Sequence, residues 1–210
     1  MGQEDLEISI KEEYKMRAAY YEGMMKELEE YLDNRYHTVG ERIDFLLSSF
    51  NELPCLSEPI LRGLIDRDFC LNPASTKYHG AYDGGLFDHS LAVIHKLLEL
   101  TVNLDLKWER PESPIIIGLF HDLCKLDTYE KDREGTWQYR TPIIPGHGVA
   151  SALIAERYVD LTEEEKICIV HHMGAYEKDF WNSYDVAVRE YPNVLFVHTA
   201  DMFASKVYGV

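Results

Sequence analysis

The chain has 210 residues, of which 46% are hydrophobic, and a formal net charge of −16 at pH 7. This length and apolar fraction suit one compact domain, and the acidity disfavours long nucleic acid as a partner because phosphate contacts require clustered Lys and Arg. No apolar run reaches the length of a membrane span, the acidic start lacks the apolar core of a signal peptide, and the four cysteines form no Cys-x-x-Cys pair, so we expect a cytoplasmic protein with reduced thiols and no membrane partner.

The N-terminal residues 5–34 are charged and contain no proline, which predicts one long helix. An apolar stripe at alternating spacings of four and three runs along it: Tyr14, Ala18, Tyr21, Met25, Leu28 and Leu32. Two interpretations stay open, because the stripe can pack on the rest of the chain or pair with its copy in a homodimer. Further amphipathic helices are predicted at 40–50 and 57–67, and residues 1–60 are expected to form a helical extension preceding a main domain at 61–210.

The stretch 68–85 is rich in turn signals, including Asn-Pro, His-Gly and Gly-Gly. It contains His79 and leads into a predicted helix that carries His89 near its start and ends near Leu100. We expect this loop to form the edge of a binding site.

The apolar run Ile115–Phe120 leads directly into His121, Asp122 and, three residues later, Lys125. Its spacing predicts a single buried helix over 114–125 with the His-Asp pair near the middle. A buried aspartate is costly unless it is paired or bound to a cation. For this pair taken alone, the alternative to a cation site is that His121 and Asp122 form a hydrogen bond with each other in the core.

The next segment, 128–141, alternates in polarity on either side of Glu134-Gly135, which predicts a short β-hairpin. Lys131, Arg133 and Arg140 lie there among aromatic residues. Such a mixture suits a nucleobase and a phosphate, whereas a solvated hairpin with ordinary cross-strand pairs is the alternative.

Three more helices are predicted in the C-terminal third. One begins at His147 and ends near Tyr158, and one begins after Thr162, which with Glu165 has the capping-box pattern. The latter leads to the adjacent His171 and His172. The last helix follows Tyr191-Pro192-Asn193 and carries His198 and Asp201.

The polar residues of these apolar segments recur at gaps of 24 to 32 residues, about one helix and one connection each: His89, His121-Asp122, His147, His171 and Asp201. This series resembles the HD-domain superfamily of metal-dependent phosphohydrolases, whose signature is a His, then His-Asp, then a distant Asp, with two further His positions in one branch. The lysine three residues after the Asp also matches. The resemblance covers residues 75–206 and implies an all-α fold: an HD-domain helical bundle at 61–210, with a small β-hairpin insertion and the N-terminal helical extension.

The resemblance also implies a ligand set for two divalent ions. One ion is expected to be held by His89, His121, Asp122 and Asp201, and the second by His147 and His171, with Asp122 bridging the two. Nitrogen and oxygen donors suit Fe, Mn, Ni, Co or Zn. Adjacent side chains on a helix point about 100° apart, so we expect His171 to face the ion and His172 to contact the ligands or the substrate from outside.

The activity implied is hydrolysis of a phosphomonoester or phosphodiester bond, in a nucleotide or short oligonucleotide, by a metal-activated hydroxide. Asp122, Lys125 and His79 are the expected catalytic residues, since the loop 78–85 is similar to the sequence before the first His in HD-type 3′–5′ exoribonucleases and related hydrolases. Three further residues are candidates for contacts with the ligands or the substrate: His198, Tyr82 and Arg140. A di-iron oxygenase of the same fold and a non-catalytic, metal-stabilised sensor or binding module are the alternatives.

Overall fold

The computed structural model describes residues 3–34, 36–176 and 181–210, excluding the side chains of 3–15 and 175. Its elements are α1 (Gln3–Leu32), α2 (Val39–Phe50), α3 (Glu58–Ile65), α4 (Gly85–Leu104), α5 (Ser113–Phe120), α6 (Lys125–Thr128), β1 (Tyr129–Lys131), β2 (Trp137–Tyr139), α7 (His147–Ala155), α8 (Glu163–His171), η1 (Gly174–Tyr176), α9 (Trp181–Glu190), α10 (Asn193–Phe203) and η3 (Ala204–Tyr208). The expected all-α bundle with one small hairpin is confirmed. Within the described residues, none of the helices is both long and apolar enough to cross a membrane.

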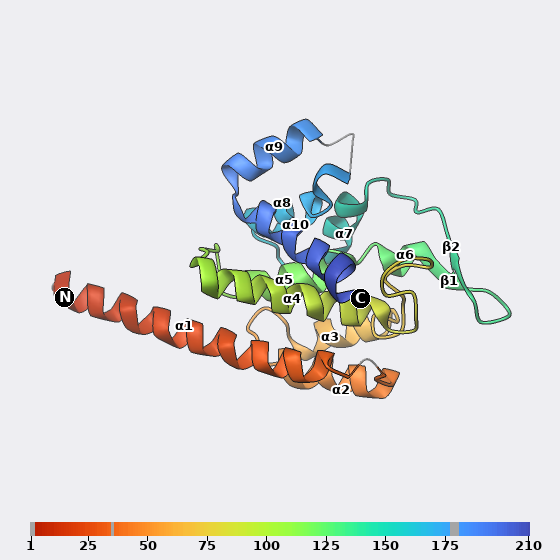
Figure 1. Cartoon of the computed structure of the whole chain (residues 1–210), viewed down its shortest axis with the longest axis horizontal. Coiled ribbons are helices and arrows are strands. Elements are labelled where there is room, and N and C mark those ends of the chain that lie inside the picture. The colour runs from red at the N-terminus through yellow and green to blue at the C-terminus, as the bar shows by residue number, and fades with distance from the viewer. Residues whose placement is uncertain (1–2, 35, 177–180) are drawn as a thin grey trace.

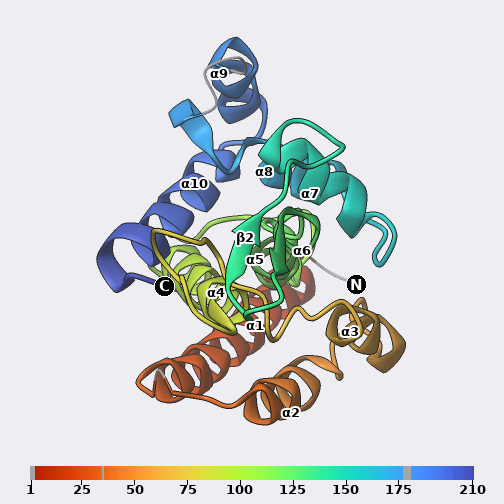
Figure 2. The same cartoon turned by 90° about the vertical axis from the view of Figure 1, so that its right-hand side faces the viewer.

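Helices α4 and α5 form the middle of the bundle (Figure 1). On one side they are covered by α1, α2 and α3, and on the other by α7, α8 and α10, as the second view also shows (Figure 2). The central position of α5 follows from its sequence, because every residue from Ser113 to Phe120 is buried. Gly118 is needed for this packing, since a Cβ there would overlap the Ile94 side chain of α4.

Helix α1 packs lengthwise against α4, and its N-terminal end extends beyond the bundle (Figure 1). Tyr21 and Leu28 of the predicted stripe are buried together with Met24 and Tyr31, whereas the side chain of Tyr14 lies outside the described residues. Packing on the rest of the chain is therefore observed for the second half of α1. The boundary near residue 60 and a homodimer through this helix stay predictions.

The hairpin and the capping box that the sequence predicts after α5 are both confirmed. The hairpin pairs Tyr129 with Tyr139 and Lys131 with Trp137 in an antiparallel register. Thr162 and Glu165 form the reciprocal capping box at the start of α8. Helix α9, in contrast, is absent from the predicted elements, and Ala187 is the one buried residue among its described side chains.

A buried ion pair joins the N-terminal helices to the central helix. The Nε and Nη2 atoms of Arg42, on α2, donate to the two carboxylate oxygens of Asp88, on α4, at 3.0 and 2.8 Å, and Nη1 donates to the carbonyl of His37. Both side chains are at most 5% exposed. Asp88 directly precedes His89, so this pair fixes the start of the helix that presents that histidine.

We expect Arg42→Met to lower the free energy of unfolding by about 3–5 kcal/mol, because the substitution leaves Asp88 buried without a counter-charge. Urea denaturation checks this value. Arg62→Ala is the matched control, since Arg62 pairs with Glu58 on an exposed face and its loss should cost less than about 0.5 kcal/mol. Equal losses in the two variants would show that the buried pair contributes no more than a surface pair.

Candidate metal centre

Asp122 lies at the centre of a buried group of histidines contributed by four segments of the chain. Its Oδ2 atom is 3.7 Å from the Nε2 atoms of both His89 and His121. Its Oδ1 atom contacts His147 Nε2 and lies 3.6 Å from His172 Nε2. One carboxylate therefore faces two pairs of imidazoles, one pair on each oxygen.

The pair on Oδ2 is completed by a second carboxylate. His89 Nε2 is 3.2 Å from Asp201 Oδ1 on α10, and it is also 3.2 Å from His121 Nε2. The structure thus brings together His89, His121, Asp122 and Asp201, which we call the first group. We call Asp122, His147 and His172 the second group.

Backbone carbonyls orient three of these rings. The Nδ1 atoms of His89, His121 and His172 lie 2.9, 2.9 and 2.6 Å from the carbonyl oxygens of Val210, Gly118 and Ile169. A carbonyl oxygen only accepts, so each Nδ1 carries the hydrogen and each Nε2 is aimed at the carboxylates. This tautomer is the one that a ring needs to coordinate a cation through Nε2.

The polypeptide between α5 and α6 differs from the prediction. Helix α5 ends at Phe120, and residues 121–124 form tighter turns in which Leu123 N donates to Phe120 O and Lys125 N donates to Asp122 O. The expected single helix over 114–125 is therefore wrong. His121 and Asp122 lie at its broken end, where His121 N still donates to Ile117 O at 2.9 Å.

The structure turns His172, rather than the expected His171, toward Asp122, and ligation of an ion by either histidine stays a prediction. His172, which is fully buried, faces Asp122, whereas the His171 ring lies 6.4 Å from the ring of Tyr184 on α9. The reason is the position of the helix end, because α8 stops at His171 and His172 begins the turn that follows. Gly148 brings α7 against this end of α8, since a Cβ there would overlap the carbonyls of Ile169 and Val170.

The charges of the centre favour ionised carboxylates, but its imidazoles differ from one another. Burial opposes protonation of His89 and His172, yet their contacts with Asp201 and Asp122 raise the pKa of both rings. Burial opposes ionisation of Asp122, but the neighbouring Lys125 and His147 hold its pKa well below the usual value. Burial likewise opposes ionisation of Asp201, and its contact with His89 nevertheless lowers its pKa. Burial lowers the pKa of His121 to about 3, so this ring is neutral at pH 7.

These residues fit divalent cations. The Nε2 atom of His172 is fully buried and has no hydrogen-bond partner among the described residues. It lies 3.6 Å from Asp122 Oδ1. A buried ring nitrogen without a partner is costly, and so are imidazole nitrogens and carboxylate oxygens that lie close together without a cation between them. Imidazole nitrogen and carboxylate oxygen are donors that Fe, Mn, Co, Ni and Zn accept.

The other predicted residues lie at different distances from the centre. Lys125 Nζ is 4.0 Å from Asp122 Oδ2. The His79 ring lies 5.0 Å from the His89 ring, and its buried Nδ1 has no partner among the described residues. Burial, reinforced by His89, lowers the pKa of His79 to about 4.

Three candidates for substrate or ligand contacts lie outside the cluster. The Tyr82 hydroxyl donates to Asp88 Oδ2 at 3.0 Å, and so supports the buried ion pair of the N-terminal helices. His198 Nδ1 lies 2.8 Å from the backbone carbonyl oxygen of His172, so it contacts the backbone of that residue rather than its ring. Arg140 is exposed and lies 3.8 Å from Glu130.

A cysteine that the sequence interpretation did not include lies beside the second group. Cys124 Sγ is 3.1 Å from Nδ1 and 3.8 Å from Nε2 of His147. Its position two residues after Asp122 was available in the sequence, but in a continuous helix those two side chains would point to nearly opposite sides.

Comparison with known proteins agrees with this geometry. The model of one family, the HD domain, matches residues 86–203, more than half of the chain and the region that contains every residue of the two groups. No curated protein and no solved structure matches the chain.

Proposed function

Because the chain belongs to the HD domain family, a superfamily of metal-dependent hydrolases, we propose that it hydrolyses a phosphoester bond in a nucleotide or short oligonucleotide. The observation that carries this proposal is the position of Asp122, whose two oxygens face separate pairs of imidazoles. Such a carboxylate is suited to bridge two cations, and two-metal sites are typical of phosphoryl-transfer enzymes.

In this proposal His89, His121, Asp122 and Asp201 hold one divalent ion, and Asp122, His147 and His172 hold the second. When bound, such ions supply a hydroxide at neutral pH and neutralise charge on the phosphate oxygens. The carbonyls that fix the Nδ1 hydrogens keep the rings in place, so the ligands need little reorganisation.

Two side chains beside the centre, Lys125 and His79, are proposed to contact the substrate. Lys125 places its ammonium group at 4.0 Å from Asp122 Oδ2, where it can stabilise a phosphate oxygen. His79 adjoins His89 at the edge formed by the 78–85 loop. The Nδ1 atom of His79 has no partner among the described residues. Because its low pKa leaves the ring neutral at pH 7, we propose that His79 contacts the scissile phosphate by a hydrogen bond.

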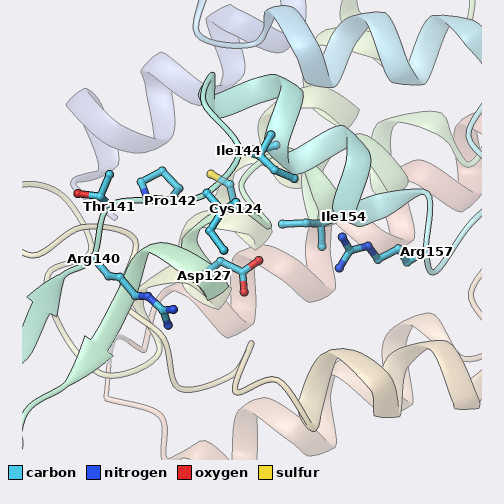
Figure 3. Close-up of a pocket in the computed structure, with 10 residues that line it drawn as sticks. Cys124, Asp127, Arg140, Thr141, Pro142, Ile144, Ile154 and Arg157 are labelled. Atoms are coloured by element: carbon cyan, nitrogen blue, oxygen red, sulfur yellow. The ribbon is translucent and has the colours of Figure 1, made fainter.

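A small substrate suits the charge of the protein. With a net charge of −16, extended contacts with a polyanion are unfavourable, whereas a local cationic site can hold one or a few phosphates. Arg140 borders a cavity next to Cys124 (Figure 3). It is our candidate for a contact with the part of the substrate that does not react.

The test begins with metal analysis of the purified full-length protein, followed by turnover of bis-p-nitrophenyl phosphate and a nucleotide panel with and without oxygen. We expect phosphoester cleavage that does not depend on oxygen and that falls at least about 100-fold after chelation of the metal. Restoration by Mn, Fe, Co, Ni or Zn would identify the working ions. Oxygen consumption coupled to bond cleavage would support the di-iron oxygenase instead, and bound metal without turnover would support a sensor or binding module.

A further inference from the structure

Cys124 is held in place beside the second group. Its backbone N–H donates to the Oγ of Ser151 at 3.1 Å, and Ser151 is fully buried on α7, one turn after His147. Cys124 itself is 3% exposed. The thiol and the imidazole of His147 are therefore positioned by the same two elements, α7 and the turn that precedes α6.

The broken helix explains how residue 124 reaches this position. Side chains two residues apart on an α-helix point about 160° apart, whereas the tighter turn of residues 121–124 reduces this angle to about 120°. Donor atoms of Asp122, Cys124 and His147 consequently all lie within 4.8 Å of one another. A regular helix would have directed the thiol away from the carboxylate.

From this arrangement we propose that the Cys124 thiolate is a ligand of the ion in the second group. The inference rests on the proposed metal centre and adds sulfur to its donors. That ion would then be held by Asp122 Oδ1, by the Nε2 atoms of His147 and His172, and by Cys124 Sγ. The Nε2 atom of His172, buried and unpartnered among the described residues, is an independent indication that a cation belongs there.

The separation of two of the proposed donors, Cys124 Sγ and His147 Nε2, is compatible with shared coordination. Tetrahedral zinc with bonds of about 2.3 Å to sulfur and 2.0 Å to nitrogen separates these two donors by about 3.5 Å. Cys124 Sγ and His147 Nε2 are 3.8 Å apart. The competing role for the thiol is a hydrogen bond with His147 Nδ1, which is nearer at 3.1 Å.

A cavity gives access to the thiol. Cys124 lines a space of about 310 Å³ bounded by Asp127, the segment 140–144, Ala150 and Ile154 of α7, and Arg157 in the turn that follows α7 (Figure 3). Cys124 lines this space, whereas Asp122, His147 and His172 are not among its described lining residues. The ligands proposed for the first ion are His89, His121, Asp122 and Asp201, which include no thiol, so the two ions would differ in ligand softness.

Sulfur changes the metal preference of the second position. A thiolate favours Zn and disfavours harder ions such as Mn. Loss of Cys124 should therefore weaken Zn binding there by at least about 10-fold. Loss of a residue that only hydrogen-bonds to a metal ligand already costs about that much. Mn binding, which gains little from sulfur, should change by less than about 3-fold.

Cobalt spectroscopy tests the bond itself. The full chain is freed of metal and reloaded with Co(II), and the visible ligand-field bands and the near-ultraviolet sulfur-to-cobalt charge-transfer band are recorded. We expect both in the unmodified protein and in the control Cys55→Ser, whose half-buried thiol has Arg110, Glu112 and Glu165 as its charged neighbours. Cys124→Ser, close in size and therefore least disruptive to folding, should keep the ligand-field bands and lose the charge-transfer band, as should Cys124→Ala.

The outcomes separate this inference from the function on which it rests. Ligand-field bands without a charge-transfer band in the unmodified protein would overturn ligation by Cys124 and leave the metal centre intact. A charge-transfer band that persists in Cys124→Ser would also overturn it. Absence of all cobalt bands would remove the metal centre and the proposed function together.

Discussion

Replacing Asp122 by asparagine is expected to lower phosphoester turnover by at least about 10³-fold and to weaken the binding of both ions. Asparagine has nearly the same shape but lacks the charge, and only one of its two terminal atoms is an acceptor. Because each carboxylate oxygen faces a different pair of imidazoles, the amide can serve one group at most. No other described residue lies in both groups.

The measurement pairs metal content, determined by plasma mass spectrometry, with initial rates on bis-p-nitrophenyl phosphate. Asp185→Asn provides the control, since that carboxylate is 60% exposed and pairs with Arg189 on α9. It should retain full activity and both ions. If Asp122→Asn also bound two ions and turned over at the control rate, Asp122 would not bridge them and the proposed mechanism would fail.

Most of the helices and the hairpin could be predicted because their signals are local or strongly periodic, whereas the convergence of the polar residues was implied by the family resemblance. The capping box of Thr162 and Glu165 is an example, since it depends only on a spacing of three residues. The apolar segments around His89 and Asp201 likewise required burial, and a buried charged residue needs partners wherever it lies.

The directions of individual side chains at helix ends could not be predicted in this way. Whether His171 or His172 faces the centre depends on where α8 stops, and this end of α8 packs closely against Gly148 of α7. The break after Phe120 is similar, because the sequence there remains compatible with a helix and tertiary packing selects the turn. Cys124 was missed as a direct consequence of that break.

Residues far away in sequence also contribute partners that a local pattern does not contain. The carbonyl of Val210 holds His89 across 121 positions, and Arg42 pairs with Asp88 across 46. Neither contact follows from periodicity or motif spacing. Both act on α4, so the orientation of the first histidine depends on chain segments at either end of the protein.

The two adjacent histidines of α8 provide a direct test of the ligand assignment. We expect His172→Ala to lose one of two bound ions and to lower turnover by at least about 100-fold, because its Nε2 faces Asp122 Oδ1 and its ring lies 5.2 Å from that of His147. His171→Ala should change turnover by less than about 3-fold, since that ring, although buried, lies beside Tyr184 on α9.

This comparison is informative because the two substitutions are adjacent and equal in size, so a general loss of helix stability would affect both. Metal content and turnover are measured together, and thermal unfolding of the metal-free variants checks that each remains folded. If loss of metal and activity followed His171→Ala instead, the ring that faces Asp122 in the structure would not be the ligand. The second group would then require a different arrangement at the end of α8, with His171 turned inward and the His172 ring displaced from its position beside His147.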